Sequence, residues 1–215
     1  MKIKVDVSDK KNVWFTSDFH LFHNNVVNHD NRPFRNEKGE PDVDAMHEAI
    51  IANWNKVVGK NDVVFYLGDL CFANIKKAQP IMSRLNGIIH FITGNHDDYE
   101  DIVKLGRFVS INDYVDLNIS GVKNLNTELK NKKGEVREFA DLHFCLMHYP
   151  IHSWNRRHHG SVMVHGHCHG NLHHDEEDNY YANGKKAIDV GCNIHDYTPI
   201  SYLEIIDKFN LNVKK

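Results

Sequence analysis

Five short apolar runs, each followed directly by a cluster of polar residues, constrain the fold of this 215-residue chain more than any other feature. The runs with their polar ends are NVWFTSDFH (12–20), DVVFYLGDL (62–70), GIIHFITGNHDD (87–98), LHFCLMHYP (142–150) and SVMVHGHCHG (161–170). Short runs rich in β-branched and aromatic residues are typical of buried strands, and polar clusters with Gly, Asn and Asp are typical of turns. We therefore predict five buried strands, each ending in a turn that carries chemically active side chains.

Two helical patterns lie between the first three runs. Apolar residues recur at helical spacing over residues 44–58, where Asp44 can cap the first turn and Gly59 can end the helix. A second helix is predicted over residues 74–85, with a local flaw at Pro80. Because strands that alternate with helices build βαβ units, the pattern predicts an α/β fold with helices on the faces of a sheet.

The whole chain, residues 1–215, is predicted to form one domain, because its length is close to the natural size of a single α/β domain. The lysine-rich segment 121–139 is predicted to be an exposed hairpin or loop, with a substrate-facing flap as the alternative. Residues 201–206 are predicted to form one late strand.

Composition argues against several classes of protein. No apolar run is long enough to span a membrane, and the start of the chain lacks the apolar core of a signal peptide, so we predict a cytoplasmic protein without a membrane partner. The net charge of -3 argues against a stable nucleic-acid complex, because proteins that coat nucleic acid carry a basic face. The four cysteines show no CxxC pair and are predicted to be reduced thiols. The oligomeric state is left open.

Histidine is unusually abundant, with 17 residues in the chain. It is the commonest metal ligand and the side chain best suited to proton transfer near neutral pH. In an α/β sheet, functional side chains gather at the carboxyl ends of the strands, and all five predicted strand ends carry such groups. They are Asp18, His20, Asp69, Asn95, His96, Asp97, His148, His167 and His169. Histidines elsewhere are assigned to structural or surface positions; His47, for example, is predicted to face out of its helix.

Together these strand ends favour a site for two divalent metal ions, although each motif alone occurs often by chance. Two ions about 3.5 to 4 Å apart need a bridging carboxylate, further nitrogen and oxygen ligands, and open positions for water and substrate. A mixture of Asp, Asn and His suits Mn, Fe, Zn or Ni better than Mg or Ca, which prefer oxygen ligands alone. We therefore predict two divalent ions per chain.

Five motifs resemble those of the calcineurin-like metallophosphoesterase superfamily, which are DxH, GD, GNHD, H and GHxH. They occur in the same order here, as DFH (18–20), GDL (68–70), GNHDD (94–98), MHYP (147–150) and GHCH (166–169). The flanking residues resemble the small bacterial and phage phosphoesterases of that superfamily, so the likeness covers most of the chain. The resemblance implies a four-layer α/β/β/α sandwich of two mixed sheets flanked by helices.

The resemblance also implies which residues hold the metals. One ion would be held by Asp18, His20 and His169. The other would be held by Asn95, His148 and His167. Asp69 would bridge the two ions.

Two further residues are implied to act in catalysis. His96 would lie beside the scissile phosphate and assist the leaving group, and Asp97 would orient His96 by accepting a hydrogen bond from its ring. Four residues near the motifs are predicted to line the substrate pocket: Arg32, as a bidentate phosphate clamp, and His23, Asn25 and His152.

The predicted function is therefore metal-dependent phosphoester hydrolysis, in which a metal-activated hydroxide attacks phosphorus in line with the leaving group. A phosphodiesterase is favoured because no cap domain is evident, and nucleotide- or nucleic-acid-derived substrates are among those compatible with the site. One alternative is a phosphomonoesterase that acts on proteins or nucleotides. The other is a non-catalytic binding scaffold of the same fold, which the intact motifs disfavour.

Overall fold

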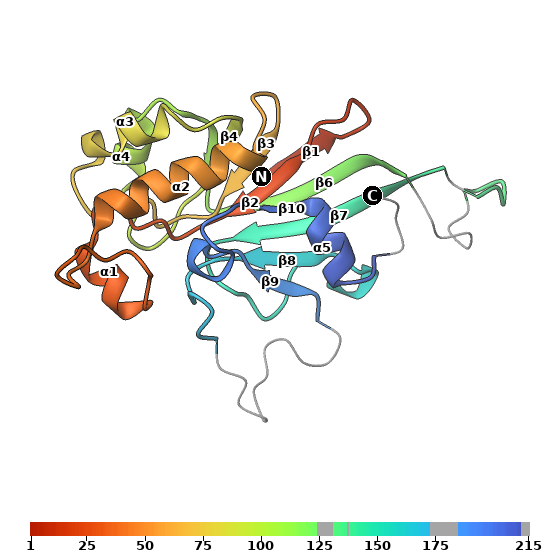
Figure 1. Ribbon diagram of the computed structural model, residues 1–215. Helices are drawn as coiled ribbons and strands as arrows, with labels where there is room; N and C mark the ends of the chain where they lie inside the picture. Colours follow the sequence, from red (N-terminus) through yellow and green to blue (C-terminus); the bar gives the residue numbers. More distant parts are fainter. Residues whose placement is uncertain (124–130, 137, 173–184, 212–215) are drawn as a thin grey trace.

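Two five-stranded sheets form the framework of the protein in the computed structural model, which describes residues 1–123, 131–136, 138–172 and 185–211 (Figure 1). The first sheet has the order β1 (Lys2–Asp6), β6 (Tyr114–Lys123), β7 (Phe139–Met147), β8 (Val162–His165) and β9 (Ala187–Asp189). The second has the order β10 (Ile200–Ser201), β2 (Val13–Thr16), β3 (Val63–Tyr66), β4 (Ile88–Ile92) and β5 (Phe108–Asn112). Each sheet contains one antiparallel pair, β6–β7 or β10–β2, and is otherwise parallel, so the predicted α/β class with two mixed sheets is confirmed.

The main core lies between the inner faces of the two sheets. Phe15 and Phe65 of the second sheet belong to the same buried cluster as Phe144 of the first, and the ring centroids of Phe15 and Phe144 are 5.6 Å apart. In β6 the inward residues Val115 and Leu117 are buried, while Asp116 between them faces outward, as the period of a strand requires. This packing holds the strand ends of both sheets at fixed positions.

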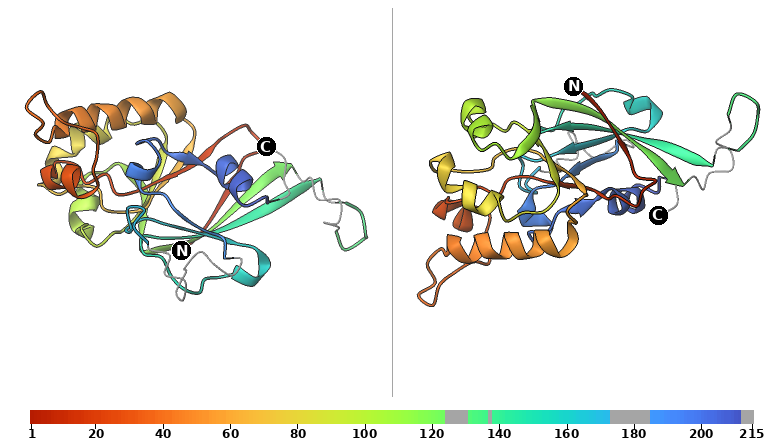
Figure 2. Two further views of the ribbon diagram at one scale, coloured as in Figure 1. Left: turned by 60° about the horizontal axis from the view of Figure 1, so that its bottom comes forward. Right: turned by 90° about the horizontal axis from the view of Figure 1, so that it is seen from above.

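Helices cover the outer face of the second sheet. They are α1 (Asn24–His29), α2 (Val43–Val57), the 3₁₀ turn η1 (Ile75–Lys77), α3 (Gln79–Met82) and α4 (Tyr99–Lys104). Figure 2 shows these helices gathered on one side of the molecule, away from the long β6–β7 hairpin. Helix α2 buries Met46, Ile50 and Trp54 against the sheet, which is the face that its apolar spacing predicts. In the described residues no helix is long and apolar enough to cross a membrane.

Three predicted elements differ from those observed. The cap of α2 is Asp42 rather than Asp44, because the Asp42 carboxylate accepts the backbone N–H of Ala45. The predicted helix over residues 74–85 is only a 3₁₀ turn followed by a single helical turn, with Pro80 in the first turn of α3. The predicted late strand ends at Ser201, because Ser201 and Glu204 form a capping box that starts helix α5 (Tyr202–Lys208).

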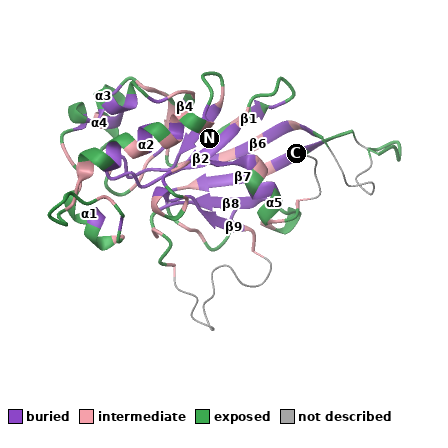
Figure 3. Cartoon of the chain, viewed as in Figure 1, coloured by how far each residue is buried: buried purple, intermediate pink, exposed green. Residues whose placement is uncertain are grey.

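The outer face of the first sheet has no helical layer in the described residues, so the finer expectation of four layers is not confirmed. Helix α5 packs against the same core cluster as the two sheets. The segment after β7 contains Trp154 and the 3₁₀ turn η2 (Arg157–His159), and Trp154 packs on the outer face against Cys145 and Met163. Figure 3 shows that much of this sheet is buried. The predicted hairpin at 121–139 is confirmed where β6 and β7 pair, while residues 124–130 and 137 lie outside the described residues.

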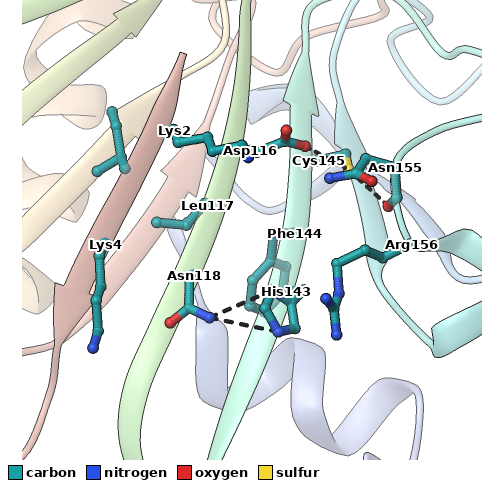
Figure 4. A pocket seen from close by; sticks show the side chains of 11 residues that line it. Lys2, Lys4, Asp116, Leu117, Asn118, His143, Phe144, Cys145, Asn155 and Arg156 are labelled. Atoms are coloured by element: carbon teal, nitrogen blue, oxygen red, sulfur yellow. Dashed lines mark hydrogen bonds between the residues drawn. The ribbon is translucent and has the colours of Figure 1, made fainter.

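A shallow cavity of about 290 Å³ lies on this outer face (Figure 4). It is lined mainly by β1, β6 and β7, with Lys2, Lys4 and Arg156 at its edges. None of the residues predicted to hold metal or to act in catalysis lines it.

Candidate metal centre

The predicted metal ligands lie at one edge of the two-sheet framework, where strands from both sheets end. Strands β2, β3 and β4 run parallel and in adjacent positions, so their carboxyl ends meet at the same edge of the second sheet. Strands β7 and β8 end at the corresponding edge of the first sheet, where Gly166 donates to the His148 carbonyl. The two edges are joined because His167 N–H donates to the Asp18 carboxylate at 3.1 Å.

The first ligand group consists of Asp18, His20 and His169, whose ligand atoms lie close enough to hold a metal ion. The Nε2 atoms of His20 and His169 are 3.1 Å apart, and Asp18 Oδ1 lies 3.4 Å from His169 Nε2. Two nitrogen ligands that are each about 2.1 Å from one ion lie about 3.0 to 3.4 Å apart at ordinary coordination angles. The observed spacing therefore suits a shared divalent ion.

The second ligand group consists of Asp69, His148 and His167, which also lie close enough to hold an ion. Asn95 adds an amide oxygen, because its Oδ1 lies 3.0 Å from His148 Nε2. His148 Nδ1 is 2.6 Å from the Leu67 carbonyl oxygen. A hydrogen bond donated by Nδ1 to this carbonyl directs Nε2 into the site, where it would bind a metal ion on losing its proton.

Asp69 lies between the two groups. Its Oδ2 is 3.6 Å from His20 Nε2 in the first group and 3.5 Å from His148 Nε2 in the second. Burial raises the pKa of the Asp69 carboxyl, but the hydrogen bond and charge of His148 outweigh it and lower the pKa to about 2. The buried carboxylate is therefore ionised at neutral pH and suits a position between two cations.

The backbone at the site is held in the left-handed region. Five predicted ligands have positive φ angles: Asp18 (60°), His20 (48°), Asp69 (59°), His167 (69°) and His169 (49°). Such conformations are uncommon for residues other than Gly and tend to gather at functional sites, where the surrounding structure enforces them. Gly94 is required beside them, because a Cβ at that position would overlap the Asp69 carboxylate.

His96 lies at the open side of the centre. Its side chain is 44% exposed, and its Nε2 is 4.0 Å from Asp69 Oδ2. The backbone N–H of His96 donates to Asp69 Oδ1, which fixes the start of the side chain beside the ligands. The imidazole therefore belongs to neither ligand group and faces solvent beside them.

The predicted role of Asp97 is wrong in this structure. Its carboxylate accepts the backbone N–H groups of Asp69 (2.7 Å), Leu70 (3.0 Å) and Gly94 (2.8 Å). No hydrogen bond joins it to the His96 ring in the part of the chain described. Asp97 instead ties the turn after β3 to the turn after β4, and burial raises the pKa of its carboxyl despite these hydrogen bonds.

The predicted role of Arg32 as a substrate clamp is also wrong, because its side chain is buried within the protein. Its guanidinium donates to the backbone carbonyls of Asp18 and Phe19, both at 3.0 Å, and to the Asp30 carboxylate at 2.7 Å. Asp30 in turn lies 2.8 Å from His169 Nδ1. Arg32 therefore supports the DFH turn and, through Asp30, the orientation of a predicted ligand.

Asp30 is thus a site residue that the sequence analysis missed, since nothing in its local sequence indicates a partner 139 positions away. Hydrogen bonds to Asp18 and Asp30 outweigh burial and raise the pKa of His169 to about 10. His47 was also misjudged. It is buried rather than outward-facing, and its Nε2 accepts the N–H of Phe22 just after the DFH turn.

We expect Asp30→Asn to weaken metal affinity by about 10- to 100-fold, because residues that orient metal-bound histidines typically have effects of this size. Calorimetric titration of the metal-free protein with Mn²⁺ or Zn²⁺ would measure the change. Asp44→Asn, at a side chain that is 93% exposed, is the matched control. Equal affinities in the two variants would contradict an orienting role for Asp30.

The other predicted substrate residues differ in their positions. The His23 ring stacks on Phe72 and lies 6.0 Å from the His20 ring, so it borders the centre. Asn25 is exposed in the first turn of α1, and His152 is exposed after β7. In the described residues no hydrogen bond or ring contact joins Asn25 or His152 to the candidate ligands.

Comparison with known proteins shows similarity over most of the chain. The uncharacterized protein MJ1445 of Methanocaldococcus jannaschii is 31% identical over 200 residues, which are 92% of this chain and 90% of that protein. The gene 66 protein of Mycobacterium phage D29 is 30% identical in an alignment of length 175, and the match covers 75% of this chain and 80% of that protein. The gene 66 protein of Mycobacterium phage L5 is 29% identical in an alignment of length 177, and the match covers 74% of this chain and 77% of that protein.

Among solved structures, the protein of unknown function AQ665 from Aquifex aeolicus shares the fold. It superposes with a TM-score of 0.60 at 24% identity and covers 92% of this chain and 98% of its own. No protein-family model matches the chain. Since none of these names states an activity, the functional assignment depends on the site itself.

Proposed function

We propose that this chain, which belongs to the family of the uncharacterized protein MJ1445 and the phage D29 gene 66 protein, is a phosphoester hydrolase that depends on two divalent metal ions. The observation that carries the proposal is the position of Asp69, with one carboxylate oxygen within 3.6 Å of a histidine nitrogen from each ligand group. A buried carboxylate between two sets of nitrogen ligands, beside an exposed histidine that belongs to neither set, suits two-ion hydrolysis.

The ligand chemistry supports this reading. When bound, two divalent ions lower the pKa of water and neutralise charge on phosphate oxygens. The mixed Asp, Asn and His donors favour Mn, Fe, Zn or Ni over Mg. His148 and His169 have their Nδ1 atoms beside a carbonyl and a carboxylate, so each Nε2 faces the centre and would bind a metal ion on losing its proton.

The side chains of the protein would orient the groups of the site and supply a proton to the leaving oxygen. Asp97 holds two of the strand-end turns together through three backbone amides, so the carboxylate of Asp69 and the backbone of His96 keep a fixed relation. The exposed imidazole of His96 would donate a proton to the leaving oxygen of the ester. We favour a phosphodiester as substrate, because the described residues place no cap over the centre. The phosphomonoesterase and the binding scaffold remain the alternatives.

Metal removal and reconstitution test the proposal. The chelated protein is expected to be inactive, and Mn²⁺, Ni²⁺ or Zn²⁺ added singly is expected to restore hydrolysis of bis(4-nitrophenyl) phosphate, with faster turnover than of 4-nitrophenyl phosphate. His96→Ala is expected to bind both ions yet lose about 100- to 10,000-fold in kcat, since that is the usual range for a lost proton donor. His159→Ala, at an exposed histidine of η2, is the matched control.

Hydrolysis that survives complete metal removal would contradict the two-ion mechanism. Faster turnover of the monoester would favour the phosphomonoesterase. Tight binding of two ions without turnover of either ester would favour the scaffold.

A further inference from the structure

Phe72 is a large apolar side chain that remains 52% exposed beside the candidate centre. It lies two residues after the GDL motif, and its backbone N–H donates to the Leu21 carbonyl at 2.9 Å. Leu21 and Cys71 also form a parallel bridge, and the Cys71 thiol accepts the N–H of Ala73. The backbone on both sides of Phe72 is therefore tied to the turns that carry the predicted ligands.

The exposed ring has a defined orientation. His23 stacks on it with ring centroids 4.0 Å apart and an interplanar angle of 24°, and His96 meets it edge-on at 5.7 Å. The rings of His23 and His96 both lie within 6.0 Å of His20, a residue of the first ligand group. Phe72 thus presents a flat apolar surface in direct contact with His96, the residue proposed to protonate the leaving group.

We infer that Phe72 is a stacking platform for a planar aromatic ring on the substrate, and that the preferred substrates are phosphoesters of nucleosides. This inference rests on the proposed function and adds the substrate class. A nucleoside carries its base one sugar ring away from the ester phosphate, and the Phe72 ring lies beside His96, with the two ring centroids 5.7 Å apart. Stacking on an exposed aromatic side chain is the usual way in which proteins bind a base without reading its identity.

An exposed phenylalanine would also attract an alkyl chain, but the geometry favours a flat group. Parallel stacking with His23 supports the ring from one side and orients it as a plane. An extended chain needs an apolar groove, whereas the neighbours of Phe72 in these contacts are the polar rings of His23 and His96. A flat nucleoside base, by contrast, needs only one supported aromatic ring on which to stack.

A pair of product-like ligands that differ only in the base tests the inference. Calorimetric titration of the metal-loaded protein is expected to show that adenosine 5′-monophosphate binds about five- to a hundredfold more tightly than ribose 5-phosphate, because one stacked base contributes on this scale. Phe72→Leu is expected to remove this preference. Phe139→Leu, at a 47% exposed phenylalanine at the opposite end of β7 from His148, is the matched control and is expected to keep it.

Equal affinities for the two ligands in the unaltered protein, or a preference that persists in Phe72→Leu, would overturn the inference. If Phe72→Leu does not fold, Phe72→Trp provides the test, because a larger ring is expected to increase the preference and an unchanged preference would count against stacking. The readout is binding rather than turnover, so it is separate from the proposed function. That function fails if no metal restores hydrolysis of bis(4-nitrophenyl) phosphate, whatever the two ligands show.

Discussion

Asp69→Asn is expected to reduce metal-dependent phosphoester hydrolysis on the order of a thousandfold or more, which is the largest effect on activity expected for a single substitution here. The carboxylate lies within 3.6 Å of histidine nitrogens in both ligand groups, and its pKa is lowered to about 2. An asparagine could still accept the His96 N–H through one oxygen, but a neutral amide cannot offset the charge of two cations.

Two measurements separate this effect from misfolding. Metal analysis after dialysis is expected to find fewer than two ions bound to Asp69→Asn, and kcat/KM for bis(4-nitrophenyl) phosphate is expected to fall with it. Asp141→Asn makes the same chemical change at an exposed position in β7 and is expected to leave both quantities unchanged. Two ions bound with full turnover in Asp69→Asn would contradict a bridging role.

Arg32→Met is expected to lower the free energy of unfolding by about 3 to 5 kcal/mol, the usual cost of removing one member of a buried ion pair. The guanidinium is buried and donates to two backbone carbonyls and to Asp30. A methionine fills much of the same space but donates no hydrogen bond, so the carbonyls of Asp18 and Phe19 lose the guanidinium and Asp30 keeps only its contact with His169.

Urea unfolding of the metal-free protein measures this loss directly. Arg35→Met is the control, because Arg35 is exposed and its guanidinium donates to the carbonyl of Gly39. If Arg32→Met were as stable as the unaltered protein but raised KM for the ester, the result would contradict the structural role and favour a direct contact between Arg32 and the substrate.

Much of the candidate site could be predicted from the sequence because its signals are local. A strand of apolar residues that ends in Asp, Asn or His places those side chains at a sheet edge, whatever the rest of the chain does. Asp18, Asp69 and His148 all follow such runs directly. The motif likeness then divided the residues into two groups, and the structure brings together Asp18 with His20 and His169, and Asp69 with His148 and His167.

The errors arose where a side chain has a partner far away in the sequence. Asp97 was assigned to its sequence neighbour His96, yet it accepts amides from the turn after β3, 27 and 28 positions earlier. Arg32 was assigned to substrate, because a sequence does not show that its guanidinium is buried against the DFH turn. His47 was placed on the outside of its helix, although Phe22 donates to it from another turn.

The sequence by itself determined which residues lie directly after the strand ends, because strand period and turn chemistry depend on adjacent residues. Only the tertiary structure decided which of them meet and how they are held. The packing of two sheets brings His169 to Asp30 and to His20, and holds five predicted ligands at positive φ. The two contacts join segments more than a hundred residues apart, and the strained backbone is stabilised by packing around it. A local sequence pattern contains neither the long-range contacts nor the packing.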